Sequence, residues 1–556
     1  MSETTSRVEP EVQGDSGGLT HRQIMTIVAG LMMGMLLAAL DMTIMGSATK
    51  TIADQLHGQT VQAWVTTAYL ITSTISTPLY GKLSDILGRK PLYLTAISLF
   101  LAGSALSAIS NSMYELAAFR ALQGLGAGGL MSLVFAIIAD IISPRERGRY
   151  QGYFMAVWGT SSVLGPVIGG FFAGADTIFG IDGWRWVFLV NVPVGIIALF
   201  VVAKVLNVPH NKVDHRVDYW GAAALTVALV PLLVVAEQGR EWGWGSGRSL
   251  AMYGTGVIGV IGFVLIERWM GDEALLPLRL FRRPTFSLTN VINFVMGLGM
   301  FGMMMTIPLY LQIVKGATPT ESGLLTLPMT AGILTASMGS GILISKTGRY
   351  KRFPVIGLGL ITAALFLFAQ IGVDTPLWKT MLIMGLAGLG LGQCMQTLIL
   401  SIQNDAPPRD MGVATAAATF FRSIGGTVGT AVFLSILFST VGDKIANAFI
   451  GVRNDPAFLA ALQQNPQFAK GLQGGSSSLD LNNTEFLKGL DPTLARPILT
   501  GFAESADTVF MVGGFVVAVA FVLVWFLKET PLSTQSGIQR TASDEQEAAA
   551  AAAIAH

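Results

Sequence analysis

Charge is scarce in this chain of 556 residues. Asp, Glu, Lys and Arg together make up 12% of it, whereas 52% of its residues are hydrophobic. A soluble domain has about 25% charged residues, and charges are costly in hydrocarbon. The net charge of +1 gives no reason to expect a nucleic-acid partner. The scarcity of charge therefore predicts an integral membrane protein whose surroundings are a lipid bilayer.

Cysteine and histidine are nearly absent as well. The single cysteine, Cys394, excludes an intramolecular disulfide and a cysteine-cluster metal site, and the five histidines lack metal-ligand spacing. No Walker-type Gly-x4-Gly-Lys-Ser/Thr motif occurs, so we do not expect ATP to be the direct energy source. Nor does the sequence offer a nucleophile–base constellation. We therefore expect no enzyme, no metal site and no cofactor.

Long apolar segments fill most of the chain. A spanning helix needs about 20 mainly apolar residues, and fourteen such helices are predicted. If the amino terminus is cytoplasmic, the short inner loops carry about three times as many Lys and Arg as the short outer loops, as the positive-inside rule requires. The sequence thus predicts an all-α membrane protein with both termini in the cytoplasm. The predicted helices are 24–48, 61–81, 91–110, 114–138, 150–175, 184–205, 219–236, 250–270, 284–312, 322–345, 353–372, 377–402, 411–440 and 506–527.

The fourteen helices group into two bundles and an insertion. An N-terminal cytoplasmic tail (1–23) precedes an N-terminal six-helix bundle (24–205), and helices seven and eight form an inserted pair (206–283). A C-terminal six-helix bundle (284–528) and a disordered cytoplasmic tail (529–556) follow. The second bundle includes a long polar outer loop at 441–505, which is a candidate docking site for a periplasmic or outer-surface partner.

A short charged loop recurs at matching places in the two bundles. Residues 81–90 read Gly-Lys-Leu-Ser-Asp-Ile-Leu-Gly-Arg-Lys, and residues 341–350 repeat the two glycines seven apart followed by Arg349. Many secondary transporters work by rocking two such halves about a central site. In the second copy Ser345 stands where the first has Asp85, so we expect that copy to have lost its charge latch.

Five motifs occur in order at corresponding helices: 40–44, 81–90, 120–126, Gly159 with 165–170, and 184–186 with Asn191 and Pro193. Together they resemble the major facilitator superfamily, and its fourteen-helix drug:proton antiporters in particular, over roughly residues 24–530. The resemblance implies a major facilitator fold of two six-helix bundles plus two inserted helices. It also implies a proton gradient as the energy source and a location in the bacterial cytoplasmic (inner) membrane. The chain departs from the family pattern after Ile44, where 45–50 end in Lys50 instead of proline.

Two opposite charges fall at similar predicted heights. Asp41 lies about 25 Å above the inner face and Arg120 about 9 Å below the outer face, at 1.5 Å per residue. In a core about 30 Å thick the two charges are within several ångströms in height. An intramembrane carboxylate is a functional candidate by default, and the resemblance makes the pair a proton and substrate relay. A static buried ion pair is the alternative. Glu115 is either a second acid or a solvated interfacial residue.

Two gates are predicted. By resemblance, Asp85 docks on the start of helix thirteen near Gly412 and Arg89 pairs with Asp140. The alternative is that the basic residues of this loop only mark topology. Glycines one turn apart let helices approach closely, and proline can bend a helix, so an outer gate is predicted in helix five, with static packing as its alternative. The cytoplasmic gate candidates are Gly81, Asp85, Gly88, Arg89, Lys90, Asp140, Gly348 and Arg349, and the outer gate candidates are Gly159, Gly165, Pro166, Gly169 and Gly170.

The substrate cavity is the least determined part. Methionine is flexible and suits promiscuous apolar binding, although ordinary lipid-compatible filler is the alternative. Arg422, near the predicted midplane, can hold substrate, hold an acid or cap backbone carbonyls. The second bundle offers no obvious midplane acid, because Asp374, Asp405, Glu504 and Asp507 fall near predicted helix ends. The cavity candidates are Trp64, Tyr69, Gln123, Asn293, Met296, Met300, Met303, Gln312, Gln393, Gln396 and Arg422.

These features predict a proton-coupled antiporter that exports amphipathic or cationic small molecules by alternating access. Two alternatives stay open. One is a dedicated exporter of a single metabolite, lipid or antibiotic. The other, more remote, is a membrane sensor or scaffold that transports nothing.

Overall fold

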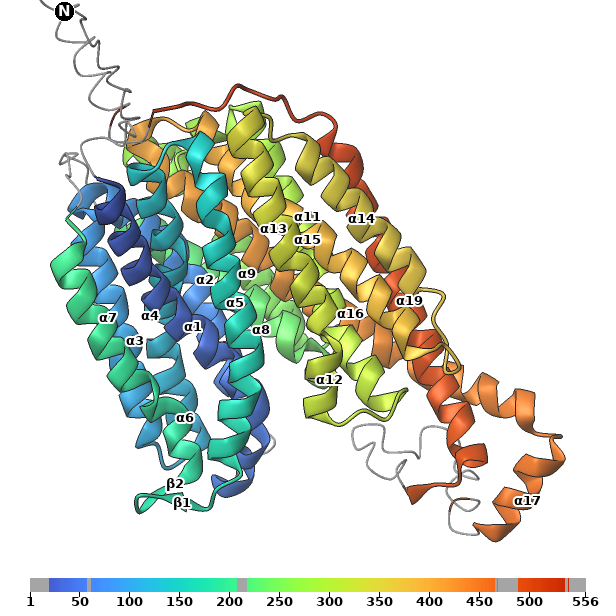
Figure 1. Cartoon of the computed structure of the whole chain (residues 1–556). Helices are drawn as coiled ribbons and strands as arrows, with labels where there is room; N and C mark the ends of the chain where they lie inside the picture. Colours follow the sequence, from blue (N-terminus) through green and yellow to red (C-terminus); the bar gives the residue numbers. More distant parts are fainter. Residues whose placement is uncertain are drawn as a thin grey trace, which may run out of the picture.

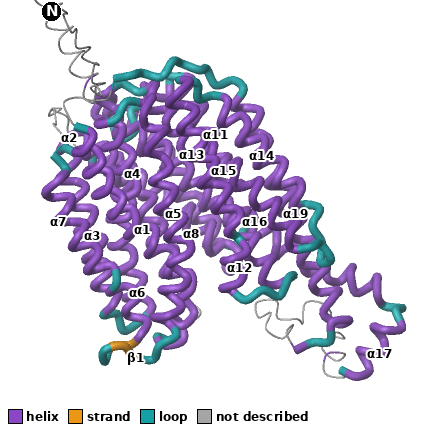
Figure 2. The backbone as a smooth tube through the Cα atoms, viewed as in Figure 1, coloured by secondary structure: helices purple, strands orange, loops and turns teal. Residues whose placement is uncertain are grey.

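The computed structural model describes residues 20–57, 62–207, 218–465 and 489–535, with the single residues 468 and 539. Figure 2 shows that helices make up nearly all of this part of the chain. The described residues contain one small antiparallel sheet, in which β1 (Thr177–Ile178) pairs with β2 (Ile181–Asp182). The predicted all-α membrane fold is therefore confirmed. Most of both predicted tails and the middle of the loop 441–505 lie outside the described residues.

The first bundle places consecutive helices against one another. Helix α2 packs mainly against α4, α1 packs against α5, and α3 lies between α4 and α7. Thr20 and Gln23 form a capping box at the start of α1, which satisfies backbone N–H groups that have no partner inside the helix. The elements are α1 (His21–Gln55), α2 (Gln62–Leu87), α3 (Arg89–Ala108), α4 (Met113–Ile141), α5 (Pro144–Ala173), η2 (Gly183–Arg185), α6 (Trp186–Leu189) and α7 (Asn191–Val205).

The second bundle lies beside the first, in yellow to red in Figure 1. Helix α11 packs against α16 and α19, and α15 packs against α13 and α14. The elements are α11 (Pro284–Ile313), α12 (Pro319–Leu325), α13 (Leu327–Thr347), α14 (Arg352–Phe368), α15 (Leu377–Asp405), η4 (Pro408–Asp410), α16 (Met411–Val452), α17 (Pro456–Gln464) and α19 (Pro492–Val524).

The inserted pair is α8 (Tyr219–Trp242) and α9 (Gly247–Met270), which pack against each other. Helix α8 also contacts α2 of the first bundle and α16 of the second. A linker with two short turns, η3 (Gly271–Glu273) and α10 (Leu278–Phe281), leads from α9 to α11. The insertion is therefore in contact with both bundles.

Twelve segments of the described residues are long and apolar enough to cross a membrane, so the protein is a multi-pass membrane protein. Two predicted spans are not among them. Helix α14 has only 17 residues. Helix α2 is rich in Ser and Thr, and several of their hydroxyls donate to carbonyls of their own helix, as Thr72 and Thr77 do.

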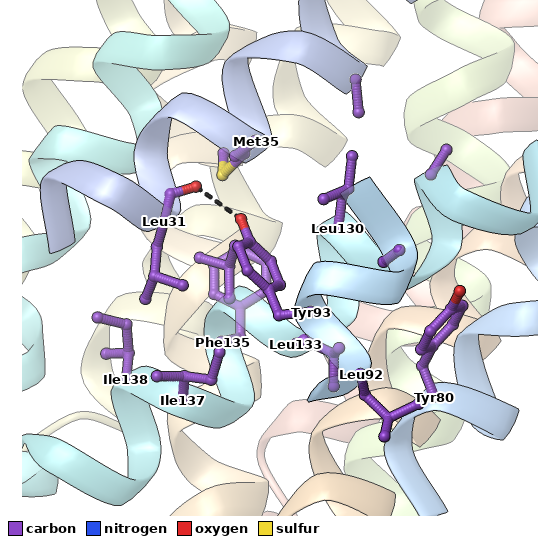
Figure 3. Close-up of a cluster of buried hydrophobic side chains, with 14 of the residues drawn as sticks. Leu31, Met35, Tyr80, Leu92, Tyr93, Leu130, Leu133, Phe135, Ile137 and Ile138 are labelled. Atoms are coloured by element: carbon purple, nitrogen blue, oxygen red, sulfur yellow. Dashed lines mark hydrogen bonds between the residues drawn. The ribbon is translucent and has the colours of Figure 1, made fainter. Parts of the chain in front are cut away.

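Two large hydrophobic cores fill the structure: the first centres on the first bundle and extends into α8, the end of α15 and the start of α16, and the second lies within the second bundle. Figure 3 shows part of the first, where Tyr93 from α3 lies among Leu130 and Leu133 of α4 and Met35 of α1. The Tyr93 hydroxyl donates to the Leu31 carbonyl at 2.9 Å. This part of the core is thus held by apolar packing among three helices and by one buried hydrogen bond between α3 and α1.

Helices continue into the predicted outer loop at 441–505. Helix α16 runs to Val452, α17 follows, and α19 begins at Pro492. Phe458, Ala461 and Leu494 form a small separate core there. Hydropathy marks the part of a helix that suits lipid, so the predicted end of α16 at residue 440 is too early and the predicted start of α19 at residue 506 is too late. Asp507, expected near a helix end, is instead in the middle of α19.

Candidate functional site

The end of the molecule where α2 meets α16 is closed by polar contacts, and we call it the Asp85 end. The Asp85 carboxylate accepts hydrogen bonds from the backbone N–H groups of Gly412 (3.2 Å) and Val413 (3.1 Å), at the start of α16. Free N–H groups and the helix dipole both favour an anion there. Arg89 forms ion pairs with Asp85 (2.6 Å) and Asp140 (2.7 Å). The structure therefore places these side chains as the resemblance implied.

Burial raises the pKa of Asp85 to about 6, although Arg89 and the bond from Val413 act in the opposite direction. Asp85 lies outside the predicted span 61–81. The close approach of α2 to the start of α16 requires glycine at position 81, because a Cβ there would lie 2.9 Å from the Gly412 carbonyl oxygen. Gly88 has φ +96°, a left-handed conformation that favours glycine. The two glycines thus permit close approach and a sharp turn.

The second copy of the loop closes the same end in a different way. Arg145, at the start of α5, donates to the carbonyls of Ser345 (3.1 Å) and Lys346 (3.4 Å) at the end of α13. A cation at a helix C-terminus is favourable. Gly348 ends α13 with φ +70°. Arg349 is exposed, and among the described residues no ion pair involves it. The second contact therefore uses backbone carbonyls where the first uses a carboxylate.

The linker after α9 adds a third contact at this end, which the sequence did not predict. Arg279 forms two hydrogen bonds to the Asp410 carboxylate (2.8 and 2.7 Å) and one to Asp272 (2.5 Å). Lys82 of α2 donates to the Asp272 carbonyl at 2.9 Å. Lys90, a predicted gate residue, instead donates to Asn207 at the end of α7. The linker thus joins α2 of the first bundle to the start of α16.

The predicted outer-gate residues divide between two helix contacts. A Cβ on Gly165 would lie 2.1 Å from Thr43 Oγ1, so α5 and α1 approach closely there, next to Pro166 within α5. A Cβ on Gly159 would lie 3.1 Å from Leu334 of α13, in the second bundle. Gly169 is buried, whereas Gly170 is exposed and a Cβ on it would meet nothing within 4 Å. Gly159, Gly165 and Gly169 are therefore at close helix contacts or buried, and Gly170 is not.

The centre of the first bundle holds a buried ion pair. Arg120 Nη1 lies 2.5 Å from Asp41 Oδ2, and their side chains are 1% and 0% exposed. Gln123 donates to Asp41 Oδ1 at 2.8 Å and accepts from Arg120 Nη1 at 2.7 Å. The Arg120 guanidinium lies 4.2 Å from the centre of the Tyr69 ring. The contact expected from helix heights is present, and two predicted cavity residues belong to it.

Asn191 of α7 completes the cluster, although the sequence did not predict it to be a site residue. Its Nδ2 donates to Asp41 Oδ1 at 2.9 Å and to Ser104 Oγ at 3.1 Å, while its buried Oδ1 has no partner. The signal was its place in the family motif 184–193. Glu115 is not part of the cluster. It is exposed at the start of α4, where its carboxylate accepts from the Asn111 N–H, so the structure supports the interfacial alternative.

The remaining cavity candidates are dispersed. Met296, Met300 and Met303 are buried in the core of the second bundle, which supports their filler alternative. Trp64 packs partly buried against the first core, and Gln312 is half-buried. Gln393 donates to a carbonyl of its own helix, at Leu389, and Gln396 is buried on the same helix.

Polar side chains of α11 and α16 lie apart from these candidates. Asn290 and Asn293 of α11 are both buried, and neither amide has a partner at its Oδ1 or its Nδ2. Arg422 of α16 is partly exposed and donates one hydrogen bond, from Nη1 to the Met395 carbonyl at 3.3 Å. No described carboxylate lies within 4 Å of it. The described residues also contain no group of three or more His, Cys, Asp or Glu that could hold a metal ion.

Known proteins resemble most of the chain. The sequence profile of the Major Facilitator Superfamily matches residues 31–430. "Multidrug transporter protein MdtP" of Bacillus subtilis is 33% identical over 535 residues, which cover 94% of this chain and 95% of that protein. "Tetracycline resistance determinant" of Streptomyces rimosus is 38% identical over 330 residues, covering 58% of this chain and 95% of that protein.

Two solved structures share the fold at low sequence identity. One is the human organic anion transporter MFSD10, with a TM-score of 0.57 and 15% identity, covering 90% of this chain and 99% of that one. The other is the proton:xylose symporter XylE, with a TM-score of 0.57 and 14% identity, covering 94% of this chain and 99% of that one.

Proposed function

This chain belongs to the major facilitator superfamily, and from that premise we propose that it exports amphipathic drugs from the cytoplasm in exchange for protons. It is a transporter and not an enzyme. The names of two relatives, a multidrug transporter and a tetracycline resistance determinant, support drugs as the cargo. Both come from bacteria, which supports the cytoplasmic membrane of a bacterium as its location.

The observation that carries the proposal is the buried pair of Asp41 and Arg120. A charge pair in a membrane interior is expensive to keep and marks a functional site by default. Asp41 receives three hydrogen bonds, from Arg120, Gln123 and Asn191. Protonation of Asp41 removes its attraction for Arg120 and leaves a buried cation without a counterion. A single proton therefore changes which arrangement of α1 and α4 is favourable, and this links proton binding to a conformational change.

Alternating access is supported by where the two bundles bind each other. Their described hydrogen bonds lie at the Asp85 end, through Asp85 with α16, Arg145 with α13, and Arg147 with Gln403 of α15 (2.8 Å). We propose that this conformation is closed to the cytoplasm and that these contacts break when the transporter opens inward. The excess of basic loops at this end supports its cytoplasmic orientation.

Flux in liposomes tests the proposal. Purified protein is reconstituted, a proton gradient is imposed, and movement of ethidium and tetracycline is followed together with internal pH. We expect opposite fluxes of drug and protons, which Asp41→Asn abolishes. The matched control is Asp374→Asn, because Asp374 is an exposed carboxylate that also pairs with an arginine, Arg496. Drug movement without proton movement, or full activity of Asp41→Asn, would refute the coupling.

A dedicated exporter of one metabolite remains the second candidate. It differs in cargo, and the same coupling residues would serve it. Proton-coupled flux of one compound alone from a broad panel would establish it. The folded ends of the segment 441–505 would then be worth testing for a partner on the outer surface.

A further inference from the structure

Two charged side chains within the spans of the second bundle, Arg422 of α16 and Asp507 of α19, have no ion pair among the described residues. Arg422 is the twelfth residue of α16, about 16 Å from its start at 1.5 Å per residue, and so near the middle of a core about 30 Å thick. It resembles Arg120 in residue type and in lying within a span. Arg120, however, has the Asp41 carboxylate, Gln123 and the Tyr69 ring around it. Arg422 has one carbonyl at 3.3 Å.

A guanidinium carries five N–H donors in a planar fork that matches an oxyanion. One of the five is used by Met395, and the side chain is partly exposed instead of sealed into the protein. An uncompensated cation at this depth is costly, because hydrocarbon cannot solvate it. A carboxylate on a bound molecule would provide both the missing charge and acceptors for the remaining donors.

Two further observations point to a ligand at the same level. Helix α11 approaches α16 closely here, since a Cβ on Gly297 would lie 2.3 Å from the Arg422 carbonyl oxygen. Asn293 is one turn before Gly297 on the same face of α11, and both polar atoms of its buried amide lack a partner. An amide left unpaired in a protein interior needs a partner from elsewhere. Its N–H groups can bind an oxyanion beside Arg422.

Acids described within the spans lie elsewhere. Asp41 is held by Arg120, and Glu267 is fully buried and accepts from the Leu276 N–H in the linker. Asp507 has no ion pair among the described residues and its buried Oδ1 has no partner, but it lies near Tyr310, toward the opposite end of the second bundle. At the level of Arg422 the charge available for binding is therefore positive.

We propose that Arg422, with Asn293 beside it, binds an oxyanion of the cargo, so that the preferred substrates are anionic or zwitterionic amphipaths that carry a carboxylate or an equivalent group. This rests on the proposed export function and replaces the expectation of purely cationic drugs. Arg422 is then the residue that determines charge specificity, while Asp41 and Arg120 serve the proton.

A pair of compounds that differ by one carboxylate tests the idea. Norfloxacin, a fluorescent quinolone acid, and its ethyl ester are titrated against purified protein in detergent, with binding read by anisotropy, and both are then followed in liposomes. We expect the acid to bind more tightly than the ester by roughly 10- to 100-fold, the size of one charge-assisted hydrogen bond. Arg422→Gln should lose this preference while keeping its affinity for the ester, and Arg422→Lys should keep part of it.

The matched control is Arg496→Gln, which removes an exposed arginine at the start of α19 that pairs with Asp374 and should leave the preference unchanged. Equal binding of acid and ester by the wild type, or tighter binding of the ester, overturns the proposal. So does an Arg422→Gln variant that loses affinity for both compounds equally, because the arginine would then only hold α15. A clear preference in binding without any flux would leave this inference standing and defeat the export function instead.

Discussion

Removing one partner of the Asp41–Arg120 pair should cost far more than removing both. Asp41→Asn keeps the side-chain shape but leaves a guanidinium that is 1% exposed without its counterion. The Arg120 Nε already lacks a partner, and only the Gln123 oxygen and the Tyr69 ring remain close. Breaking a buried pair in this way costs about 3–5 kcal/mol, whereas replacing both charges is often nearly neutral. We therefore expect Asp41→Asn to be strongly destabilised and Asp41→Asn with Arg120→Gln to be restored.

The assay is unfolding in detergent, read by tryptophan fluorescence during denaturant titration and by the thermal midpoint. The double variant should come within about 1 kcal/mol of the wild type. Export should stay lost in both, because the double variant regains packing without regaining a group that can bind a proton. If Asp41→Asn is as stable as the wild type, the reasoning is refuted, because the charge of Asp41 then does not offset the cost of burying Arg120. A double variant that exports with proton coupling would remove Asp41 from the mechanism.

Three further outcomes follow from the geometry. Burial raises the pKa of Asp85 from 3.8 to about 6 in the closed form, so the closed form binds a proton on Asp85 more tightly than the open form does. Lowering the pH from 7 to 5 should therefore shift the equilibrium toward closure, and Asp85→Asn should abolish this shift. The distance between spin labels at the end of α2 and in η4 measures it. Gly165→Val should destabilise the protein by about 1–3 kcal/mol and reduce export, because its Cβ would collide with Thr43, whereas Gly170→Val should do neither in the same unfolding and flux assays. Asn191→Leu should reduce proton-coupled export in the liposome assay, since it removes one of the three hydrogen bonds that Asp41 accepts; export equal to that of the wild type would show that Asn191 only packs.

Sequence was sufficient where one physical rule dominated. The number and order of most spans followed from hydropathy, and the Asp41–Arg120 contact followed from helix rise. The docking of Asp85 on the start of α16 followed from the resemblance to a known family.

Sequence was insufficient where partners came from distant segments. Arg145 closes the second loop copy through backbone carbonyls, which leave no mark in side-chain sequence. Arg279 reaches Asp410 over 131 residues, and a charge in a linker reads as an ordinary solvated one. The methionines of α11 could not be assigned either, because apolar side chains carry no sign of which face is buried. Helices α16 and α19 were read too short, since hydropathy stops at the lipid boundary while the backbone continues.

Helix α16 is long enough to act as a lever arm. Helix α16 has 42 residues, which is about 63 Å at 1.5 Å per residue and twice the thickness of a hydrocarbon core of about 30 Å. Its first turn is held by Asp85, and its far end joins α17 away from the bundles (Figure 1). A rocking motion of about 10° at the held end would sweep the far end through about 11 Å over that length. A binder or a fluorescent label attached to the tip would therefore report small movements at the gate as large displacements, and a binder that immobilised the tip would stall the transport cycle without entering the membrane.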